Sequence, residues 1–312
     1  MTVLVRLPNH VGDACMALPA LHLLRDAGLR CALVGRGWGD SLFEGMHMPY
    51  VTIHGSLLHD VASVRRAPRS IEDEMRGLVL PNSFGSALLF VLADVPSAGL
   101  ATSHRSMLLR WPSPEPAECH EVERFYSAAS AALRAWGITA DRGAPPPALD
   151  LPLTHAQRSA AAALRSMGKG GERYALVAPV ATGLHRGQVK HWAHFARLMP
   201  VLRERGVMPV AAPPPAEVDA ARAALPGATI LPPVPLGVFA ALAEGAAVVI
   251  ANDSGTSHVA AAVGARQVTI FGVTDRIRTG PWSKRAVCVG SNGAWPGVEE
   301  VVAALDEALQ LP

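Results

Sequence analysis

The sequence predicts an α/β protein built from two halves of alternating strands and helices. Short runs such as Ala247–Ala251, which is continuously apolar, and Gln267–Phe271 are typical of strands buried on both faces of a parallel sheet. Helix-compatible segments separate these runs along the chain. A proline-rich segment, Ala144–Pro152, interrupts the pattern and favours a stiff, extended linker. We therefore predict two Rossmann-like domains, residues 1–150 and 151–312, that face each other across a ligand-binding cleft at the carboxyl edges of their sheets.

The first half shows each kind of element in turn. Met16, Ala20, Leu23 and Leu24 recur at helical spacing, and Gly28 follows as a stop signal. The strands that we expect in this half are Thr2–Leu7, Cys31–Gly35, Pro49–Ile53 and Gly77–Leu80. The helices that we expect run from about Ala14 to Ala27, from about Ala87 onward and across Glu118–Trp136.

The second half repeats the alternation. Its expected strands are Tyr174–Pro179, Val207–Ala212, Ala247–Ala251 and the β-branched run Gln267–Phe271. Its expected helices are His155–Met167, His194–Arg205, Pro235–Glu244 and His258–Gly264.

Composition excludes several classes of protein. The 312 residues are 50% hydrophobic, which is enough for one large domain or two ordinary ones, and the net charge of +2 gives no reason to expect a nucleic-acid partner. The chain opens directly into a strand without a signal peptide, and no apolar run is long enough to span a membrane. The cysteines show no metal-ligand spacing, and we expect free thiols at Cys15, Cys31, Cys119 and Cys288. These features predict a cytoplasmic protein.

The turn between the strands Ala247–Ala251 and Gln267–Phe271 has the pattern of a phosphate site. It begins Asn252-Asp253-Ser254-Gly255 and leads into a helix that Asp253 or Ser254 can cap. Gly255 lets the backbone approach a ligand closely, and the first amides of the helix, with its dipole, favour an anion. An ordinary capped turn is the alternative, and the segment alone leaves both interpretations open.

Several blocks in this order resemble the ADP-heptose:lipopolysaccharide heptosyltransferase family. The first is Val5–Asp13 followed by Met16–Leu21, and the second is Leu80–Phe84 with Ser86–Leu88. The remaining blocks are His120 ahead of Tyr126, Lys190 with Trp192 and His194–Ala196, Asn252–Gly255 with His258 and Ala260–Ala261, Phe271–Gly272, and Thr274–Asp275. Together they cover nearly the whole chain, and the second heptosyltransferase of the inner core is the most similar type.

This resemblance implies a GT-B fold and an inverting glycosyltransferase that uses no metal and no cofactor beyond a nucleotide sugar, ADP-heptose. It implies a lipid-linked oligosaccharide acceptor of lipopolysaccharide biosynthesis, bound by the first domain at the inner face of the inner membrane. The catalytic residues would be Asp13 and Lys190. The donor-binding residues would be Thr182, Lys190, Glu217, Asp253, Ser254, Gly255, Thr256, Ser257 and His258. The acceptor-binding residues would be Asn9, His10, Gly12, Asn82, Ser83 and His120.

The residues themselves allow both these roles and plainer ones. Asp13 follows the first strand and opens a helix whose dipole keeps it ionised, so it can act as a general base or simply cap the helix. Lys190 can bind a diphosphate or lie solvated in a loop. The basic residues of the first half suit either an anionic membrane surface or a solvated face; they are Arg65, Arg66, Arg69, Arg105 and Arg110.

Three other functions fit the same architecture. The scaffold can use another nucleotide sugar or a protein or glycan acceptor. A nucleotide-sugar epimerase would need acid and base groups around the sugar and no second substrate. A binding module without catalysis is the third alternative, although Asp13 and Lys190 argue against it.

Overall fold

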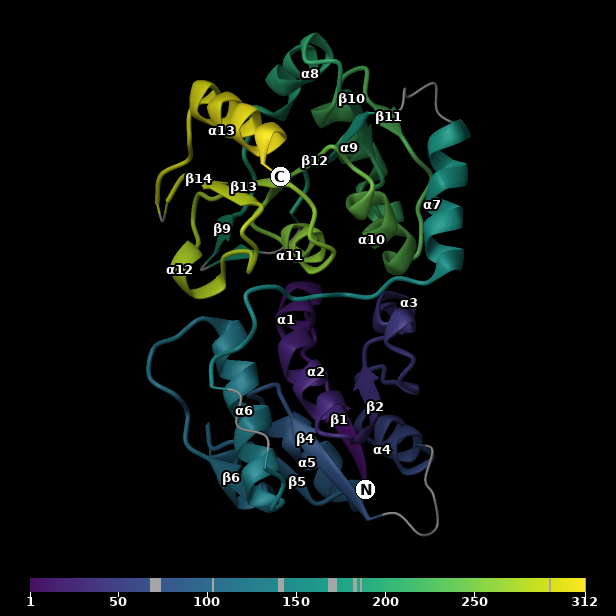
Figure 1. The fold of residues 1–312 in the computed structure, drawn as a ribbon, viewed down its shortest axis with the longest axis vertical. Coiled ribbons are helices and arrows are strands. Elements are labelled where there is room, and N and C mark those ends of the chain that lie inside the picture. Colours follow the sequence, from purple (N-terminus) through teal and green to yellow (C-terminus); the bar gives the residue numbers. More distant parts are fainter. Residues whose placement is uncertain are drawn as a thin grey trace. The chain divides into compact units, whose positions relative to one another are not determined.

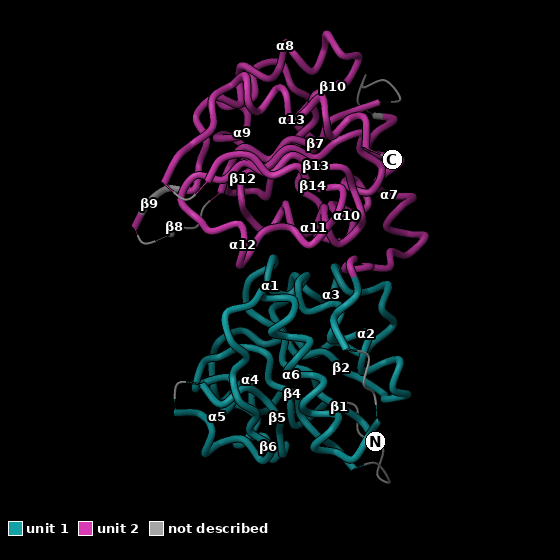
Figure 2. The backbone as a smooth tube through the Cα atoms, turned by 60° about the vertical axis from the view of Figure 1, so that its left-hand side comes forward, with its two compact units in different colours: residues 1–146 teal, residues 147–312 magenta. Residues whose placement is uncertain are grey.

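The computed structural model describes residues 1–67, 74–102, 104–139, 143–167, 173–181, 184–185, 187–291 and 293–311. The chain divides into two compact units, Met1–Pro146 and Pro147–Pro312 (Figure 2). The boundary that we predicted from the linker lies between residues 150 and 151. Each unit is an α/β layer structure with its own parallel sheet (Figure 1).

The first unit contains a six-stranded sheet of order β3-β2-β1-β4-β5-β6, in which every pairing is parallel. Its strands are β1 (Thr2–Arg6), β2 (Arg30–Gly35), β3 (Tyr50–Thr52), β4 (Met75–Val79), β5 (Ser97–Leu100) and β6 (Trp111–Ser113). Its helices are α1 (Val11–Met16), α2 (Leu18–Asp26), α3 (Trp38–Leu42), α4 (Leu57–Arg65), α5 (Phe84–Leu92) and α6 (Glu121–Ala135), with the 3₁₀ turns η1 (Glu44–Met46) and η2 (Arg105–Leu108).

Helices cover both faces of this sheet. On one face, side chains of α4 and α5 such as Val64 and Phe90 pack on Leu4, Val34 and Val79. On the other face, α2 packs along α6, and these helices contact β2 and β5. Because β1 is buried along its whole length, the residues that follow it are held at the carboxyl edge of the sheet.

The second unit repeats this plan with a sheet of order β11-β10-β7-β12-β13-β14 and a small antiparallel pair, β8-β9. Its strands are β7 (Tyr174–Ala178), β8 (Leu184–His185), β9 (Gln188–Val189), β10 (Met208–Ala211), β11 (Thr229–Ile230), β12 (Val248–Asn252), β13 (Gln267–Ile270) and β14 (Ala286–Val289). Its helices are α7 (His155–Met167), α8 (Phe195–Glu204), α9 (Val218–Ala224), α10 (Leu236–Glu244), α11 (Gly255–Ala262), α12 (Arg276–Thr279) and α13 (Val298–Gln310), with the 3₁₀ turn η3 (Pro215–Glu217).

The core of the second unit lies between the sheet and the helices α8 and α13. Leu198 and Val301 from these helices pack on Val177, Ile250 and Ile270. Figure 2 shows α8 and α13 on one side of the strands and α10 and α11 on the other. This sandwich fixes β12, and therefore the turn that leads from β12 into α11.

Several helix boundaries differ from the prediction; α6, for example, begins at Glu121, three residues after the expected Glu118. The helix expected from Ala14 to Ala27 is two helices, α1 and α2, because Pro19 lacks the amide that would continue the hydrogen-bond ladder. The helices expected from Ala87 and from His258 both begin three residues earlier, at Phe84 and Gly255. In both cases a serine occupies the N-cap position.

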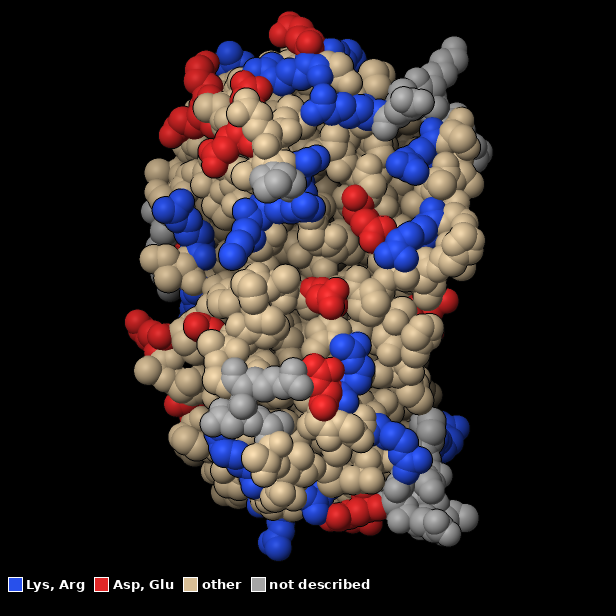
Figure 3. All heavy atoms as spheres, viewed as in Figure 1, with Lys and Arg blue, Asp and Glu red and all other residues tan. Residues whose placement is uncertain are grey.

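The surface carries charges of both signs. Figure 3 shows Lys and Arg interspersed with Asp and Glu over the face in view, in agreement with a net charge of +2. Within the described part of the chain, no helix combines the length and the apolar composition that crossing a membrane requires.

Candidate functional site

The candidate residues fall into two groups, one in each unit, and each group is described within its own unit. The second-unit group is centred on the turn between β12 and α11. Ser254 occupies the N-cap position of α11 in an extended conformation, yet its hydroxyl makes no capping hydrogen bond and has no partner. The expected serine cap is therefore absent. Within the described residues, no acceptor is bound to the amides of Gly255 and Thr256, so the start of α11 is free to bind an anion.

A cluster of charged side chains lies at the same turn. The Lys190 ammonium is 3.3 Å from a carboxylate oxygen of Asp253, and the other oxygen of Asp253 is 3.9 Å from His258 Nε2. Asp253 and His258 are each 6% exposed at the side chain, whereas Lys190 is 22% exposed. Asp253 thus holds Lys190 beside the helix start. An ammonium group has three donors, so Lys190 can still donate to a phosphate oxygen while it contacts Asp253.

Asn252 anchors the segment that carries Lys190. Its side chain is fully buried; it accepts from the amide of Trp192 at 3.0 Å and donates to the carbonyl of Pro179 at 2.8 Å. The Trp192 indole is also buried and donates to the carbonyl of Pro296 at 2.9 Å. Asn252 therefore ties the end of β12 to the end of β7 and to the Lys190 segment. The sequence shows Asn252 as an unusual polar end to an apolar strand, but it does not show what the amide bonds.

The other predicted donor residues have different environments. Ser257 is buried, and its hydroxyl donates to the Ser254 carbonyl at 2.8 Å. Gly255 is the first helical residue and is not among the glycines with positive φ, so the turn needs no left-handed residue there. Glu217 is half-buried at the end of η3, after β10, which lies one strand beyond β7 in the sheet. Thr182 lies outside the described residues.

The first-unit group begins with the turn between β1 and α1. Asn9 and His10 are exposed, Gly12 is buried, and His10 is the N-cap residue of α1 without a side-chain cap. Asp13 lies in the first turn of α1 and is half-buried. The carboxylate therefore lies at the positive end of a helix at the carboxyl edge of the sheet, which stabilises its ionised form.

The turn after β4 lies next to the β1 turn, because β1 and β4 are neighbouring parallel strands. The Asn82 side-chain oxygen is buried and has no hydrogen-bond partner, which leaves it available to a ligand donor. Ser83 instead caps α5: its hydroxyl accepts from the amide of Ser86 at 3.3 Å and lies 2.7 Å from the Ser86 hydroxyl. The structure thus gives Ser83 a structural function beside the predicted acceptor contact.

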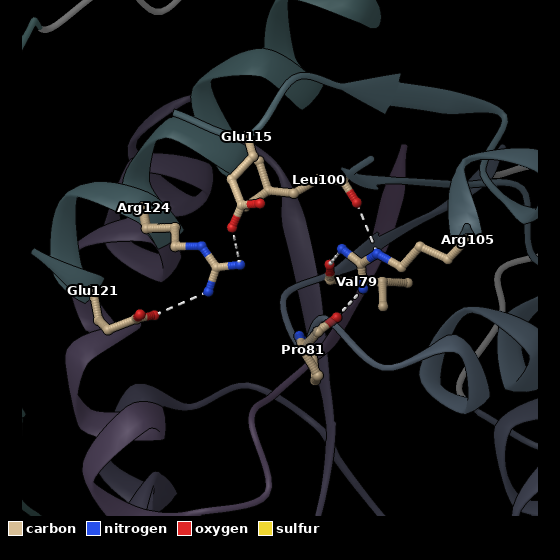
Figure 4. A network of polar contacts seen from close by, with 7 residues as sticks. All are labelled: Val79, Pro81, Leu100, Arg105, Glu115, Glu121 and Arg124. Atoms are coloured by element: carbon tan, nitrogen blue, oxygen red, sulfur yellow. Dashed lines mark hydrogen bonds and ion pairs between the residues drawn. The ribbon is translucent and has the colours of Figure 1, made fainter. Parts of the chain in front are cut away.

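Figure 4 shows two buried arginines of the first unit, of which Arg105 supports the turn after β4 and Arg124 lies at the start of α6. The Arg105 side chain is fully buried and donates to the carbonyls of Leu100, at 2.7 Å, and Pro81, so it fixes the residue before Asn82. Burial, together with the charge of Arg124, lowers the pKa of Arg105 to about 10. Arg124 pairs with Glu115 at 2.6 Å and with Glu121 at 3.2 Å.

His120 is the N-cap residue of α6 in a complete capping box. Its ring Nδ1 accepts from the amide of Val122 at 3.2 Å, and Glu123 accepts from the amide of His120 at 2.9 Å. As with Ser83, the structure shows a capping role, and the acceptor contact stays a prediction. No group of three or more His, Cys, Asp or Glu side chains that could hold a metal ion occurs among the residues that the structure describes.

Comparison with known proteins finds a family match over most of the chain and solved structures of similar fold over nearly all of it. The sequence profile of glycosyltransferase family 9 (heptosyltransferase) matches residues 64–303. No curated protein matches.

Three solved structures illustrate the likeness in fold. ADP-heptose lps heptosyltransferase II of E. coli has 23% identity and a TM-score of 0.77, with 99% of this chain and 98% of that chain covered. E. coli heptosyltransferase WaaC with ADP has 19% identity and a TM-score of 0.75, with 98% of each chain covered. A glycosyl transferase family 9 protein from Veillonella parvula has 16% identity and a TM-score of 0.82, with 99% and 97% covered. The predicted α/β class and GT-B fold are confirmed.

Proposed function

Because this chain belongs to glycosyltransferase family 9, the heptosyltransferase family, we propose that it transfers heptose from ADP-heptose to an acceptor of the lipopolysaccharide inner core. Family membership makes the chain a glycosyltransferase, as the sequence predicted, and it removes the epimerase and the binding module from consideration. The donor, the acceptor, the inversion of configuration and the independence from metal ions are our proposal.

The observation that carries this proposal is the turn between β12 and α11. An ADP leaving group gains negative charge as the bond to the sugar breaks, and that charge needs compensation. The free amides of Gly255 and Thr256 and the Lys190 ammonium, held by Asp253, offer positive charge at one place. The E. coli WaaC structure of similar fold holds ADP, which supports an adenine nucleotide as the donor.

The proposed reaction also needs a base. The acceptor hydroxyl oxygen attacks the anomeric carbon of the heptose, the bond from that carbon to the diphosphate oxygen breaks, and ADP leaves with the electron pair. Asp13 takes the hydroxyl proton. The helix dipole keeps Asp13 ionised but makes it a weak base, so the proton moves late, once the attacking oxygen has become acidic.

The decisive experiment measures ADP release from ADP-heptose by the full chain, with and without a heptose-deficient lipopolysaccharide acceptor. We expect release that depends on the acceptor, together with an acceptor mass increase of one heptose unit. The proposal would be contradicted if ADP were released equally without the acceptor, or if no ADP were released with any acceptor tested. A thermal-shift panel of ADP-, UDP- and GDP-sugars would then identify the donor, because ligand binding raises the melting temperature by mass action.

We also propose that the first unit contacts the anionic inner surface of the inner membrane, where a lipid-linked acceptor would be found. Leu58 on α4 and Met107 on η2 are 83% and 80% exposed, and the exposed residues Arg65 and Arg66 follow at the end of α4. Apolar side chains beside basic ones suit an anionic bilayer. Co-sedimentation with phosphatidylglycerol vesicles should exceed that with phosphatidylcholine vesicles, and Leu58→Glu should reduce it; equal sedimentation with both lipids would contradict the proposal.

A further inference from the structure

Arg6 lies buried at the end of β1 with part of its guanidinium unused. Its side chain is 4% exposed and shares a face of β1 with the core residue Leu4, since alternate residues of a strand point to one face. One terminal nitrogen donates to the carbonyl of Leu7, and the other donates to the side-chain oxygen of Asn9 at 2.6 Å. A further donor, Nε, is buried without a hydrogen-bond partner among the described residues. In the part of the chain that the structure describes, the hydrogen bonds of Arg6 therefore go to neutral oxygens.

Arg36 brings a second guanidinium to the same end of the sheet. It directly follows β2, the neighbour of β1. Arg36 is two residues after Val34 and four after Ala32, so it has the same place in the strand alternation as these two core residues. Within the described residues, no hydrogen bond or ion pair holds its guanidinium, which is half-buried. Burial, and then the charge of Arg36, lowers the pKa of Arg6 to about 10.

The backbone around Arg36 is fixed by Tyr50. The Tyr50 hydroxyl donates to the Arg36 carbonyl at 2.7 Å and lies against Gly35 and Gly39, where any side chain would overlap it. On the other side, a Cβ atom at Gly55 would lie 3.1 Å from a terminal nitrogen of Arg36, so the guanidinium lies against the turn between β3 and α4. Arg36 is thus placed by two contacts that leave its donors free.

The carboxylates near this cluster are not paired with its guanidiniums in the part of the chain that the structure describes. The carboxylate that acts on Arg6 is Asp60, which is 4% exposed. Its two oxygens already accept from the amides of His54, at 2.8 Å, and Gly55, at 2.9 Å, and one lies 3.9 Å from the His59 ring. Buried charges in proteins are usually paired and hydrogen-bonded. Among the described residues, neither guanidinium therefore forms an ion pair with a carboxylate, although the charge of Asp60 acts on Arg6 and that of Asp40 acts on the neighbouring Tyr50.

We propose that Arg6 and Arg36 form an oxyanion site for a phosphate group. Guanidinium donors match the oxygens of phosphate in geometry and charge, and their hydrogen bonds to an anion are the stronger, charge-assisted kind. Arg6 also holds Asn9, which opens the turn that leads to Asp13. If the proposed function holds, and this assignment rests on it, the phosphate is a substituent of the acceptor.

The site can be tested without catalysis by NMR of the arginine side chains. The full chain, labelled with ¹⁵N-arginine and sequence-specifically assigned, is titrated with sodium phosphate and with sodium chloride at equal ionic strength. We expect the Arg6 Nε–H resonance to move saturably with phosphate alone. Arg36→Gln should weaken that response by about tenfold or more, because one charge-assisted partner is lost. Arg25→Gln, which removes an exposed arginine of the same unit, should leave it unchanged.

The Arg6 resonance reports on the first unit, so phosphate bound at α11 in the second unit does not affect the conclusion. The proposed site is wrong if the Arg6 Nε–H resonance does not move with phosphate, or if it moves equally in Arg36→Gln. Circular dichroism verifies that the variant is folded.

A kinetic comparison separates this proposal from the proposed function. Arg36→Gln should raise the KM for a phosphorylated acceptor at unchanged KM for ADP-heptose, and a dephosphorylated acceptor should abolish the difference. Free phosphate should compete with the acceptor in the parent protein but not in Arg36→Gln. If phosphate binds at Arg6 and these kinetic differences are absent, the ligand is free phosphate and the acceptor assignment fails. If the parent protein transfers no heptose, the proposed function fails while the NMR result still decides the site.

Discussion

The turns that follow β4 and β12 occupy the same place in the two sheets, each after the fourth strand in sheet order, but they treat their helix starts differently. Both turns place a serine at the N-cap. In the first unit the Ser83 hydroxyl accepts from the Ser86 amide and so fills the start of α5 with a protein group. In the second unit the Ser254 hydroxyl has no partner. The start of α5 is thus capped by the protein itself, whereas the amides at the start of α11 stay available to an anion.

The turn between β1 and α1 shows a third arrangement. Here the helix start carries its own negative charge, because Asp13 lies in the first turn of α1. A phosphate would be repelled at this position, whereas a proton acceptor is stabilised in its charged form. Similar strand–turn–helix units thus provide a structural cap in one case and, in our proposal, an anion site and a base in the other two. The difference is set by a few residues at each helix start and not by the fold.

The largest expected effect concerns Asp13. Asp13→Ala should lower turnover by about 10²–10⁴-fold, which is the usual contribution of a general base, and should leave ADP affinity unchanged. Steady-state kinetics and calorimetric titration with ADP would measure the two quantities. Asp40→Ala is the matched control, since Asp40 also lies in the first turn of a helix of this unit. Near-normal turnover in Asp13→Ala would show that Asp13 is not the general base.

Gly255→Val, unlike Asp13→Ala, should act mainly on the affinity for ADP. A branched side chain at the first residue of α11 would lie where the diphosphate must approach the amides, so the affinities for donor and ADP should fall together. Loss of even one charge-assisted hydrogen bond corresponds to roughly a tenfold or greater loss of affinity. Gly85→Val is the control, because Gly85 lies in the first turn of α5 with open space around it.

Calorimetry with ADP on both folded variants decides this second prediction. ADP affinity equal to that of the parent protein in Gly255→Val would place the phosphate site away from α11. Acceptor binding should change little in this variant.

The elements that the sequence predicted well are those with strong local signals. β1, β2 and β12 each have an apolar centre that is buried, and α7 agrees with its predicted bounds. β5 and β6 were not predicted. β5 contains Gly99, where a Cβ atom would lie 2.9 Å from the Val79 carbonyl, and β6 contains Pro112, which a strand at the sheet edge tolerates. α13 was missed although its apolar residues recur at helical spacing.

The candidate site was predictable only in part. Resemblance to a family pointed to Lys190 and Asp253, and the structure brings the two side chains together. Contacts between residues far apart in the chain had no sequence signal. Asn252 reaches Trp192, and Arg105 reaches the carbonyl of Pro81, only because the packed layers bring them there. The sequence also could not predict that Ser254 leaves α11 uncapped, since it shows a residue able to cap a helix but not the direction of its hydroxyl.

The two N-cap serines give a smaller and more specific test of the comparison. Ser83→Ala should lower the free energy of unfolding by about 1 kcal/mol, because the start of α5 loses its cap. Ser254→Ala should cost little stability, since no hydrogen bond of its hydroxyl is lost. Urea unfolding followed by circular dichroism compares the two. An equal cost in both variants would show that Ser254 does cap α11, and the difference between the turns would disappear.

The smallest expected effect is that of chelation, which should leave transfer unchanged. If α11 and Lys190 supply the positive charge that the leaving diphosphate needs, no divalent ion is required to stabilise the leaving group at this turn. The measurement compares the initial rate of ADP release before and after EDTA treatment, with Lys190→Ala as the reference for losing a cation. That variant should be slowed, and added magnesium should not restore it. A rate that falls with EDTA and returns with magnesium or manganese would mean that the open helix start acts together with a metal ion, and the contrast between the β4 and β12 turns would then describe only part of the donor site.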